Sequence, residues 1–177
     1  MIKIGIIGDI GSGKSFIAKQ FGFPVFNADK EVTKIYNNNK KCYLILKKKL
    51  PEYFFSFPIK KKELIRAILK KKNNIKKIVK IVHPFVKLKM IQFIKKNKNK
   101  KFLILDIPLL LENRLNKKNY ILIFVSAKKK DIQKRLKKRP NYNQQIFDKL
   151  KKLQFPLEIK KKKSNFIIKN NFNTTYA

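Results

Sequence analysis

Residues near the start of the chain have the types and the spacing of a phosphate-binding loop. Residues 8–15 read G-x-x-x-x-G-K-S, between an apolar stretch (2–7) that predicts a buried strand and a stretch (16–21) that predicts a helix. In such a unit the glycines let successive backbone N–H groups converge on phosphate oxygens. Lys14 would reach the β- and γ-phosphates, and the Ser15 hydroxyl would bind Mg²⁺. The sequence therefore predicts that the chain binds a nucleoside triphosphate.

Two carboxylates stand where further predicted strands end. Asp106 closes the apolar stretch 102–106, which is the Walker B pattern, in which a carboxylate holds the water shell of Mg²⁺. Asp29 follows a short predicted strand at 24–26, at the sheet edge where ligands bind in open α/β folds. There it could act as a base or in the Mg²⁺ shell, and it could equally cap a helix predicted at 30–36. Position alone leaves these roles open.

Two arginines and one histidine complete the set of candidates. Arg135 and Arg139 lie four residues apart in a basic stretch that begins at residue 128, and so would share one helix face. In a kinase such arginines can come from a lid that folds over the transferring phosphate, and they can equally form a solvated basic face. His83, the only histidine, lies with Pro84 between two helical patterns. A lone histidine is more often a packed or capping residue than a catalyst, so its sequence context does not assign it a role.

The elements that must position these residues alternate between strand and helix. Strands are predicted at 2–7, 24–26, 102–106, 120–125 and 165–168. Helices are predicted at 16–21, 30–36, 40–50, 59–69, 75–82, 85–94, 128–138 and 143–154. This alternation, without an internal repeat, favours a parallel α/β sheet. The aromatic stretch 52–58 is interpreted as core or docking residues rather than as a base-stacking platform.

The composition indicates one domain and gives little guidance to a partner. The chain has 177 residues, 44% of them hydrophobic, which is enough for a single core. Its net charge of +36 is carried by lysines in nearly every segment, whereas arginine, the better base and phosphate reader, occurs at only four positions. An AT-rich coding sequence would enrich Lys, Asn and Ile whatever the function. We therefore do not expect nucleic acid as the partner.

Cysteine usage and the apolar runs bear on the compartment. Cys42 is the only cysteine, which excludes an intrachain disulfide and fits a reducing cytoplasm. A strand at residue 2 leaves no room for a signal peptide. The longest apolar runs, 102–111 and 120–127, are too short to span a bilayer. We expect a cytoplasmic protein that is not attached to a membrane.

The motifs, taken in order, resemble those of the dephospho-CoA kinase family over residues 2 to about 171. The matching segments are 6–15 (the phosphate loop), 25–29 (V-x-D-A-D), 62–69 with 83–84 (the substrate-side helices and H-P), 106–113 (P-L-L-x-E-N), 133–139 (Q-x-R-x-x-x-R) and 154–170 (Q-x-P…K…A-D-x-V-I-x-N). The phosphate loop alone would not single out this family. The D-A-D, H-P and P-L-L-x-E segments in that order do.

The resemblance implies ATP-dependent phosphorylation of the ribose 3′-hydroxyl of dephospho-coenzyme A. It also implies a P-loop NTPase-type three-layer sandwich with a five-stranded parallel sheet. Within that single domain we expect a core (1–37, 98–127 and 164–171), a helical CoA-binding subdomain (about 38–97) and a lid (about 128–160). The expected partners are ATP with Mg²⁺ and dephospho-CoA, and the expected state is a monomer or weak homo-oligomer.

The resemblance also implies roles for particular residues. The expected catalytic residues are Asp29, as the base that accepts the hydroxyl proton, and Lys14. The expected ATP-binding residues are Gly11, Ser12, Gly13, Lys14, Ser15, Phe16, Arg135, Arg139 and Asn170. The expected substrate-binding residues are Asp29, His83, Pro108, Leu109 and Glu112, and the expected metal ligands are Ser15 and Asp106.

The chain departs from the family pattern at several points. Asn27 replaces the first Asp of D-A-D, Phe16 stands where Thr often follows the loop serine, and Leu153 stands where Arg often precedes the glutamine. Ser164-Asn165 replaces Ala-Asp, and we expect no helix after the last strand. These departures put the catalytic rate and the lid contacts in question more than the family.

Three other interpretations remain. Another small P-loop kinase, acting on a nucleoside monophosphate or a hydroxylated metabolite, would share Lys14 and the arginines but would not need the H-P and P-L-L-x-E segments. A basic nucleic-acid-binding protein with a nucleotide switch would need a clustered basic face and salt-sensitive binding. A degenerate, inactive kinase would not need to retain Lys14, Ser15, Asp29 and Asp106.

Overall fold

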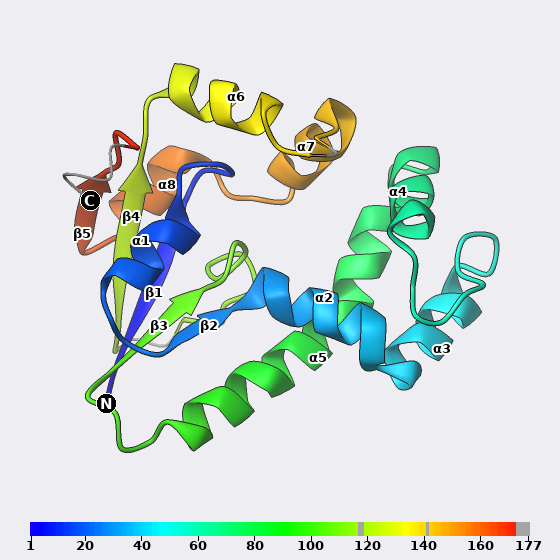
Figure 1. Cartoon of the computed structure of the whole chain (residues 1–177), viewed down its shortest axis with the longest axis horizontal. Helices are drawn as coiled ribbons and strands as arrows, with labels where there is room; N and C mark the ends of the chain where they lie inside the picture. Colours follow the sequence, from blue (N-terminus) through cyan, green and yellow to red (C-terminus); the bar gives the residue numbers. More distant parts are fainter. Residues whose placement is uncertain (117–118, 141, 173–177) are drawn as a thin grey trace.

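A parallel sheet forms the centre of the molecule. The computed structural model describes residues 1–116, 119–140 and 142–172. Within these ranges the strands are β1 (Ile2–Gly8), β2 (Val25–Asn27), β3 (Phe102–Asp106), β4 (Tyr120–Ser126) and β5 (Phe166–Lys169). They pair in parallel in the order β2-β3-β1-β4-β5. The predicted five-stranded parallel sheet is confirmed, and its carboxyl edge carries the ends of β1, β2 and β3 (Figure 1).

Helices cover both faces of the sheet. They are α1 (Lys14–Gln20), α2 (Ala28–Asn38), α3 (Lys40–Lys49), α4 (Lys61–Lys70), α5 (Asn74–Lys96), α6 (Lys129–Lys137), α7 (Gln144–Lys151) and α8 (Leu157–Lys162). Because strand side chains alternate, Ile6 faces the cluster that includes α1, whereas Ile7 faces the cluster that includes α2, α3 and α5. This arrangement is the predicted three-layer sandwich. Figure 1 shows α3 and α4 beside the sheet rather than over it, and α6 and α7 beyond its carboxyl edge.

The two helices predicted around His83 are one helix, so that prediction was wrong. α5 runs for 23 residues with Pro84 inside it. Proline removes one backbone N–H and so leaves the carbonyl of Lys80 without its helical donor. Both Pro84 and Lys80 are exposed, so water can satisfy that carbonyl, while Val82 and Val86 pack into the core on the other face. Packing on both sides of the proline therefore keeps the helix continuous.

The start of α2 settles one alternative that the sequence left open. Asn27, not Asp29, is the N-cap of α2, and its side chain accepts a hydrogen bond from Lys30 N. Asp29 lies within the first turn, where it is free to serve another role.

The helix α6 ends at Lys137, so Arg139 lies beyond it. The prediction that Arg135 and Arg139 share one helix face was therefore wrong. The short helix α8 was not predicted, because a run of lysines after Pro156 carries no apolar periodicity.

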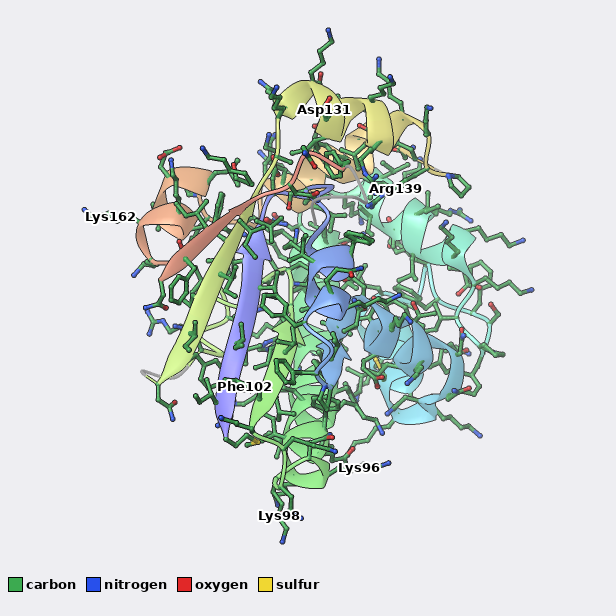
Figure 2. The ribbon with its side chains drawn as sticks, turned by 60° about the vertical axis from the view of Figure 1, so that its left-hand side comes forward. Lys96, Lys98, Phe102, Asp131, Arg139 and Lys162 are labelled. Atoms are coloured by element: carbon green, nitrogen blue, oxygen red, sulfur yellow. The ribbon has the colours of Figure 1, made fainter. Side chains whose placement is uncertain are left out.

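Exposed lysines occur on different sides of the molecule (Figure 2). Figure 2 shows Lys162 pointing outward from one side of the molecule, and Lys96 and Lys98 from one end. In the aromatic stretch, Tyr53 and Phe54 are buried, as a core role predicts, whereas Phe55 is exposed. In the described part of the chain no helix combines the length and apolarity needed to cross a membrane. The prediction that no helix follows β5 falls partly on residues 173–177, which lie outside the described ranges.

Candidate active site

The segment between β1 and α1 forms a loop that only glycine permits at several positions. Gly11 and Gly13 both have φ of 89°, in the left-handed region. A Cβ atom at Gly13 would lie 2.2 Å from Nδ2 of Asn170, which donates a 2.9 Å hydrogen bond to the carbonyl of Ser12. Asn170 follows β5, so the last strand holds the loop from behind. Ser12 is fully buried, and its hydroxyl has no hydrogen-bond partner within the described residues.

Lys14 folds back over this loop. Its Nζ donates hydrogen bonds to the carbonyls of Asp9 (2.6 Å) and Gly8 (3.3 Å). Burial lowers the pKa of the Lys14 ammonium to about 8, although the nearby carboxylate of Asp106 acts in the opposite direction. Phosphate oxygens are stronger partners for an ammonium than carbonyls are, so a bound polyphosphate would draw Nζ towards itself.

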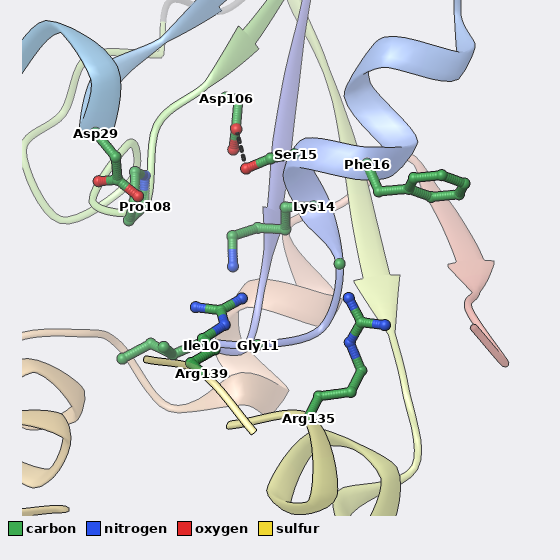
Figure 3. A pocket seen from close by; sticks show the side chains of 11 residues that line it. Ile10, Gly11, Lys14, Ser15, Phe16, Asp29, Asp106, Pro108, Arg135 and Arg139 are labelled. Carbon is green, nitrogen blue, oxygen red and sulfur yellow. Dashed lines mark hydrogen bonds between the residues drawn. The ribbon is translucent and has the colours of Figure 1, made fainter. Parts of the chain in front are cut away.

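Ser15 and Asp106 meet at the carboxyl edge of the sheet. The β2–β3 register sets Asn27 beside Asp106, and the β1–β3 register sets Ile6 on its other side. Ser15 Oγ donates a 2.5 Å hydrogen bond to Asp106 Oδ2, drawn as a dashed line in Figure 3. Asn27 Nδ2 donates to the same oxygen at 2.5 Å. The two predicted metal ligands are therefore adjacent, as their positions after β1 and β3 required.

Asp29 faces the same space from α2. Burial raises the pKa of its carboxyl group and the negative charge of Asp106 raises it further, while Lys14 and Arg139 oppose the shift. Its side chain still reaches solvent through the open side of the cavity. A carboxylate with a raised pKa is a stronger proton acceptor than an ordinary aspartate.

These groups line one polar cavity of about 240 Å³. Figure 3 shows Arg135 and Arg139 entering it from one side, with Asp29 and Asp106 on the other. The lining residues are Ile10, Gly11, Gly13, Lys14, Ser15, Phe16, Asp29, Asp106, Pro108, Arg135 and Arg139. The cavity thus joins a phosphate-binding loop, three cationic side chains and two carboxylates.

A second cavity of about 290 Å³ adjoins the first and is mostly apolar. Its walls come from α2, α4, α5, α7 and the segment after β3, and they include His83, Pro108 and Leu109. Ile10, Asp29 and Pro108 line both cavities, so the two spaces meet at Asp29. The carboxylate of Asp29 therefore lies where the polar cavity borders the apolar one.

Comparisons with known proteins identify the family. The sequence model described as "Dephospho-CoA kinase" matches residues 2–175. The chain belongs to the dephospho-CoA kinase family. A dephospho-CoA kinase of Wolbachia sp. subsp. Brugia malayi is 35% identical over 170 residues, covering 93% of this chain and 87% of the relative. The activity of the family is ATP-dependent phosphorylation of dephospho-CoA to CoA, and the chain is a kinase of this class.

Solved structures agree with this family assignment. The structure of TT1252 from Thermus thermophilus has a TM-score of 0.77 and 25% identity, with 98% of this chain and 90% of that chain covered. The dephospho-CoA kinase from Campylobacter jejuni has a TM-score of 0.59 and 25% identity, with the same coverage. The P-loop kinase fold predicted from the sequence is therefore confirmed.

Three of the residues expected at the site, Ser12, Glu112 and Asn170, do not line either cavity. Glu112, expected on the substrate side, lies with its side chain 8% exposed against Lys160, whose Nζ is 2.8 Å from Glu112 Oε1. The same oxygen accepts a 2.8 Å hydrogen bond from Phe155 N. Glu112 thus joins the segment after β3 to the chain between α7 and α8. Asn170, expected at ATP, contacts the loop from behind through Ser12.

Other features of the site were not predicted. The apolar cavity is walled by α5 side chains at helical spacing, and from that pattern the sequence predicted helices but no cavity. These side chains are Ile75, Ile78, Val79, Val82 and Val86. Ile10 lines both cavities and lies inside the loop motif at a position that the motif leaves unspecified. Lys160 was noticed only as part of a family segment, and no local signal indicates that it is buried.

The pKa of Lys14 leads to a prediction for ATP binding. At pH 8.5 roughly three quarters of Lys14 is neutral in the free protein, given a pKa of about 8. Bound triphosphate raises this pKa, so ATP binding at pH 8.5 is expected to take up as much as about three quarters of a proton per site. Calorimetric titration with Mg²⁺-free ATP in two buffers of different ionisation enthalpy measures this uptake. Lys19→Met, which removes an exposed lysine of the same helix, should leave it unchanged. A wild-type titration without proton uptake would contradict the prediction.

Proposed function

We propose that the chain transfers the γ-phosphoryl group of ATP to the ribose 3′-hydroxyl of dephospho-CoA, with Asp29 as the general base. One observation carries this assignment: Asp29 lines both the polar cavity and the apolar cavity. A hydroxyl group presented from the apolar side would reach the carboxylate at the point where the polar side offers phosphate. General-base catalysis needs such hydrogen-bond contact between the base and the attacking hydroxyl.

ATP occupies the polar cavity. Some backbone N–H groups here already have acceptors: those of Ile10 and Ser12 bond to Asp9, and those of Phe16 and Ile17 bond to the carbonyl of Gly13. The N–H groups of Gly11, Gly13, Lys14 and Ser15 would bind phosphate oxygens. Lys14 exchanges its carbonyl partners for the β- and γ-phosphates. Arg135 and Arg139 neutralise charge from the opposite side, and Phe16 borders the nucleotide at the entrance to the cavity. Asn170 keeps the loop in shape through its bond to Ser12.

The residues at the base of the cavity fit Mg²⁺. A hydroxyl and a carboxylate oxygen, Ser15 Oγ and Asp106 Oδ2, lie within 2.5 Å of each other. Among the described residues no cluster of three or more His, Cys, Asp or Glu could enclose a metal by itself. This set suits Mg²⁺, which is commonly held by one or two protein oxygens together with phosphate oxygens and water. When bound, Mg²⁺ would supply neutralisation of the phosphate charge.

The acceptor occupies the apolar cavity. Pro108 and Leu109 would border it from the segment after β3, and His83 would face it from α5. His83 Nε2 is buried and has no hydrogen-bond partner among the described residues, so it is available to a polar group of the acceptor. Burial and the neighbouring Lys87 lower the pKa of His83, which favours the neutral imidazole.

The chain works as one domain with two accessory parts. Residues from about 38 to 97 form the acceptor-binding subdomain, and residues from about 128 to 160 form a lid. The lid assignment is supported by Lys149 of α7, whose Nζ donates to the carbonyls of Ile68 (2.6 Å) and Leu69 (3.0 Å) at the end of α4. This contact joins α7 to α4 across the apolar cavity, which both helices line. It would limit the access of water, which would otherwise compete with the acceptor.

Catalysis then rests on alignment and charge. Asp29 accepts the proton of the 3′-hydroxyl as the hydroxyl oxygen attacks the γ-phosphorus, and the bond from that phosphorus to the β–γ bridging oxygen breaks to release ADP. Lys14, Arg135 and Arg139 stabilise the charge on the phosphate oxygens. Holding acceptor and phosphate on either side of Asp29 converts a bimolecular step into a positioned one.

The surface lysines and Cys42 bear on the partners and the compartment of the enzyme. The basic surface extends over different sides of the molecule, as Lys96, Lys98 and Lys162 illustrate, which does not favour the nucleic-acid-binding alternative (Figure 2). The buried, unpaired Cys42 is consistent with work in the cytoplasm. The chain acts there as a monomer or weak homo-oligomer.

The decisive assay compares acceptors. ATP consumption with purified protein should depend on dephospho-CoA and should yield a product phosphorylated on the ribose 3′-oxygen. Nucleoside monophosphates and small hydroxylated metabolites serve as competing acceptors. Turnover with one of these, and none with dephospho-CoA, would refute the assigned acceptor and leave a P-loop kinase of another substrate.

A further inference from the structure

Asn27 lies at the point where three parts of the site meet. It is the last residue of β2 and the N-cap of α2, the helix that carries Asp29. The sheet register sets it directly beside Asp106. It is also the position where the family pattern has an aspartate.

The Asn27 side chain uses both ends of its amide. Nδ2 donates to Asp106 Oδ2 at 2.5 Å, and Oδ1 accepts from Lys30 N at 2.9 Å. Nδ2 also lies 3.4 Å from Ser15 Oγ. These partners fix the orientation of the amide, because a backbone N–H requires an acceptor and an ionised carboxylate requires a donor.

An ionised aspartate could not make both contacts. Its carboxylate would cap α2 as well as an asparagine does. It has no N–H group, however, and would set a second negative charge against Asp106 at hydrogen-bond distance. A serine could keep the cap but would be too short to replace the amide donor at Asp106. The double contact is therefore specific to asparagine at this position.

We propose that Asn27 is a positioning residue, whose amide fixes the Asp106 carboxylate and the first turn of α2 relative to each other before nucleotide binds. This inference rests on the proposed function, since it concerns the same two carboxylates. The Asn27 side chain keeps the Asp106 carboxylate oriented towards Ser15. It also fixes the first turn of α2, and so the position of Asp29 relative to Asp106. In this chain the Asn27 amide holds the Asp106 carboxylate directly. A carboxylate at position 27 could hold Asp106 only with a cation between the two groups.

The first test separates positioning from simple helix capping. Asn27→Ser keeps a capping oxygen, and Asn39→Ser makes the same change at the N-cap of α3, where Asn39 Oδ1 accepts from Cys42 N at 2.8 Å. Both variants should stay folded at the assay temperature, and Asn27→Ser should melt below Asn39→Ser because it also removes a donor from the buried Asp106 carboxylate. Asn27→Ser alone should lower kcat by about 10- to 100-fold, as expected for loss of a partner that orients a ligand residue, while KM for dephospho-CoA stays unchanged. Wild-type kcat in Asn27→Ser would overturn the proposal.

The second test needs no acceptor and no turnover. Without Mg²⁺ or nucleotide, Asn27→Asp should melt below the wild type, because its carboxylate faces Asp106. Asn39→Asp makes the same change at the N-cap of α3, away from Asp106, and should not lower the melting temperature. Equal melting temperatures for Asn27→Asp and the wild type would overturn the proposal. The affinity for Mg²⁺ in the ADP complex should fall by about 10- to 100-fold in Asn27→Ser, and an unchanged affinity would count against positioning.

The two tests also distinguish this inference from the proposed function. If the wild type fails to phosphorylate dephospho-CoA, the assigned acceptor is wrong. The melting and Mg²⁺–ADP measurements still decide the role of Asn27, because they depend on the protein and the nucleotide alone.

Discussion

The Asp29→Asn variant is expected to turn over dephospho-CoA about 10²- to 10⁴-fold more slowly than the wild type, the range typical for loss of a general base. The amide has the size of the carboxylate but cannot accept the hydroxyl proton. The phosphate loop and Lys14 remain, so the affinity for ATP should stay within a few-fold of the wild-type value. Steady-state kinetics for kcat and equilibrium titration for ATP binding measure the two effects separately.

Glu31 offers a matched control for this experiment. It is an acidic residue of the same first turn, lies outside both cavities, and pairs with Lys34 at 2.7 Å. Glu31→Gln should therefore retain turnover close to the wild-type value. If Asp29→Asn were as active as Glu31→Gln, Asp29 would not be the base, and Asp106 or a water molecule would have to accept the proton.

Lys160→Met is expected to lower the free energy of unfolding by about 3–5 kcal/mol, the range for removing one partner of a buried ion pair. The Lys160 side chain is 1% exposed. Its Nζ also donates to Gln154 Oε1 at 2.7 Å, so one ammonium holds both the glutamate and the chain beyond α7. Without it, Glu112 is a buried charge whose Oε2 already has no hydrogen-bond partner in the described residues. Urea denaturation followed by circular dichroism, without nucleotide, measures the loss.

The pair Lys71–Glu52 provides the comparison. Its charged atoms are 3.8 Å apart and both side chains are about two-thirds exposed, so Lys71→Met should change the free energy of unfolding by at most about 1 kcal/mol. The double variant Lys160→Met with Glu112→Leu should recover much of the lost stability, because it leaves no unpaired charge. A Lys160→Met variant no less stable than Lys71→Met would contradict the assignment of this ion pair.

Sequence reasoning succeeded where local chemistry determines structure. Glycines with positive φ and an apolar run that ends in a carboxylate are local properties, so the phosphate loop and the bounds of β3 were predicted correctly. The contact between Ser15 and Asp106 followed from parallel strands ending at one edge. Family resemblance added the acceptor and the role of Asp29, which spacing alone left open.

The remaining features depend on tertiary contacts that have no local signature. The apolar residues of α5 have the same helical spacing whether they enclose a cavity or fill a core, so Val82 and its neighbours were not recognised as a cavity wall. Pro84 normally predicts a helix break, and only packing on both sides of it keeps α5 intact. Lys160 looks like any lysine of a basic run, and its burial depends on Glu112, which is far away in the sequence.

The continuity of α5 bears on how the enzyme closes. The first half of this helix walls the apolar cavity through residues such as Ile78, and the second half packs on the sheet, where Phe93 meets Phe26 with ring centroids 5.6 Å apart. One continuous helix therefore connects the wall of the apolar cavity to the sheet, whose strand β1 leads into the phosphate loop. We therefore expect this cavity wall and the phosphate loop to keep a fixed separation during the reaction. Movement of the proposed lid, α6 and α7, would then control the entry of substrate and the exclusion of water without changing that separation.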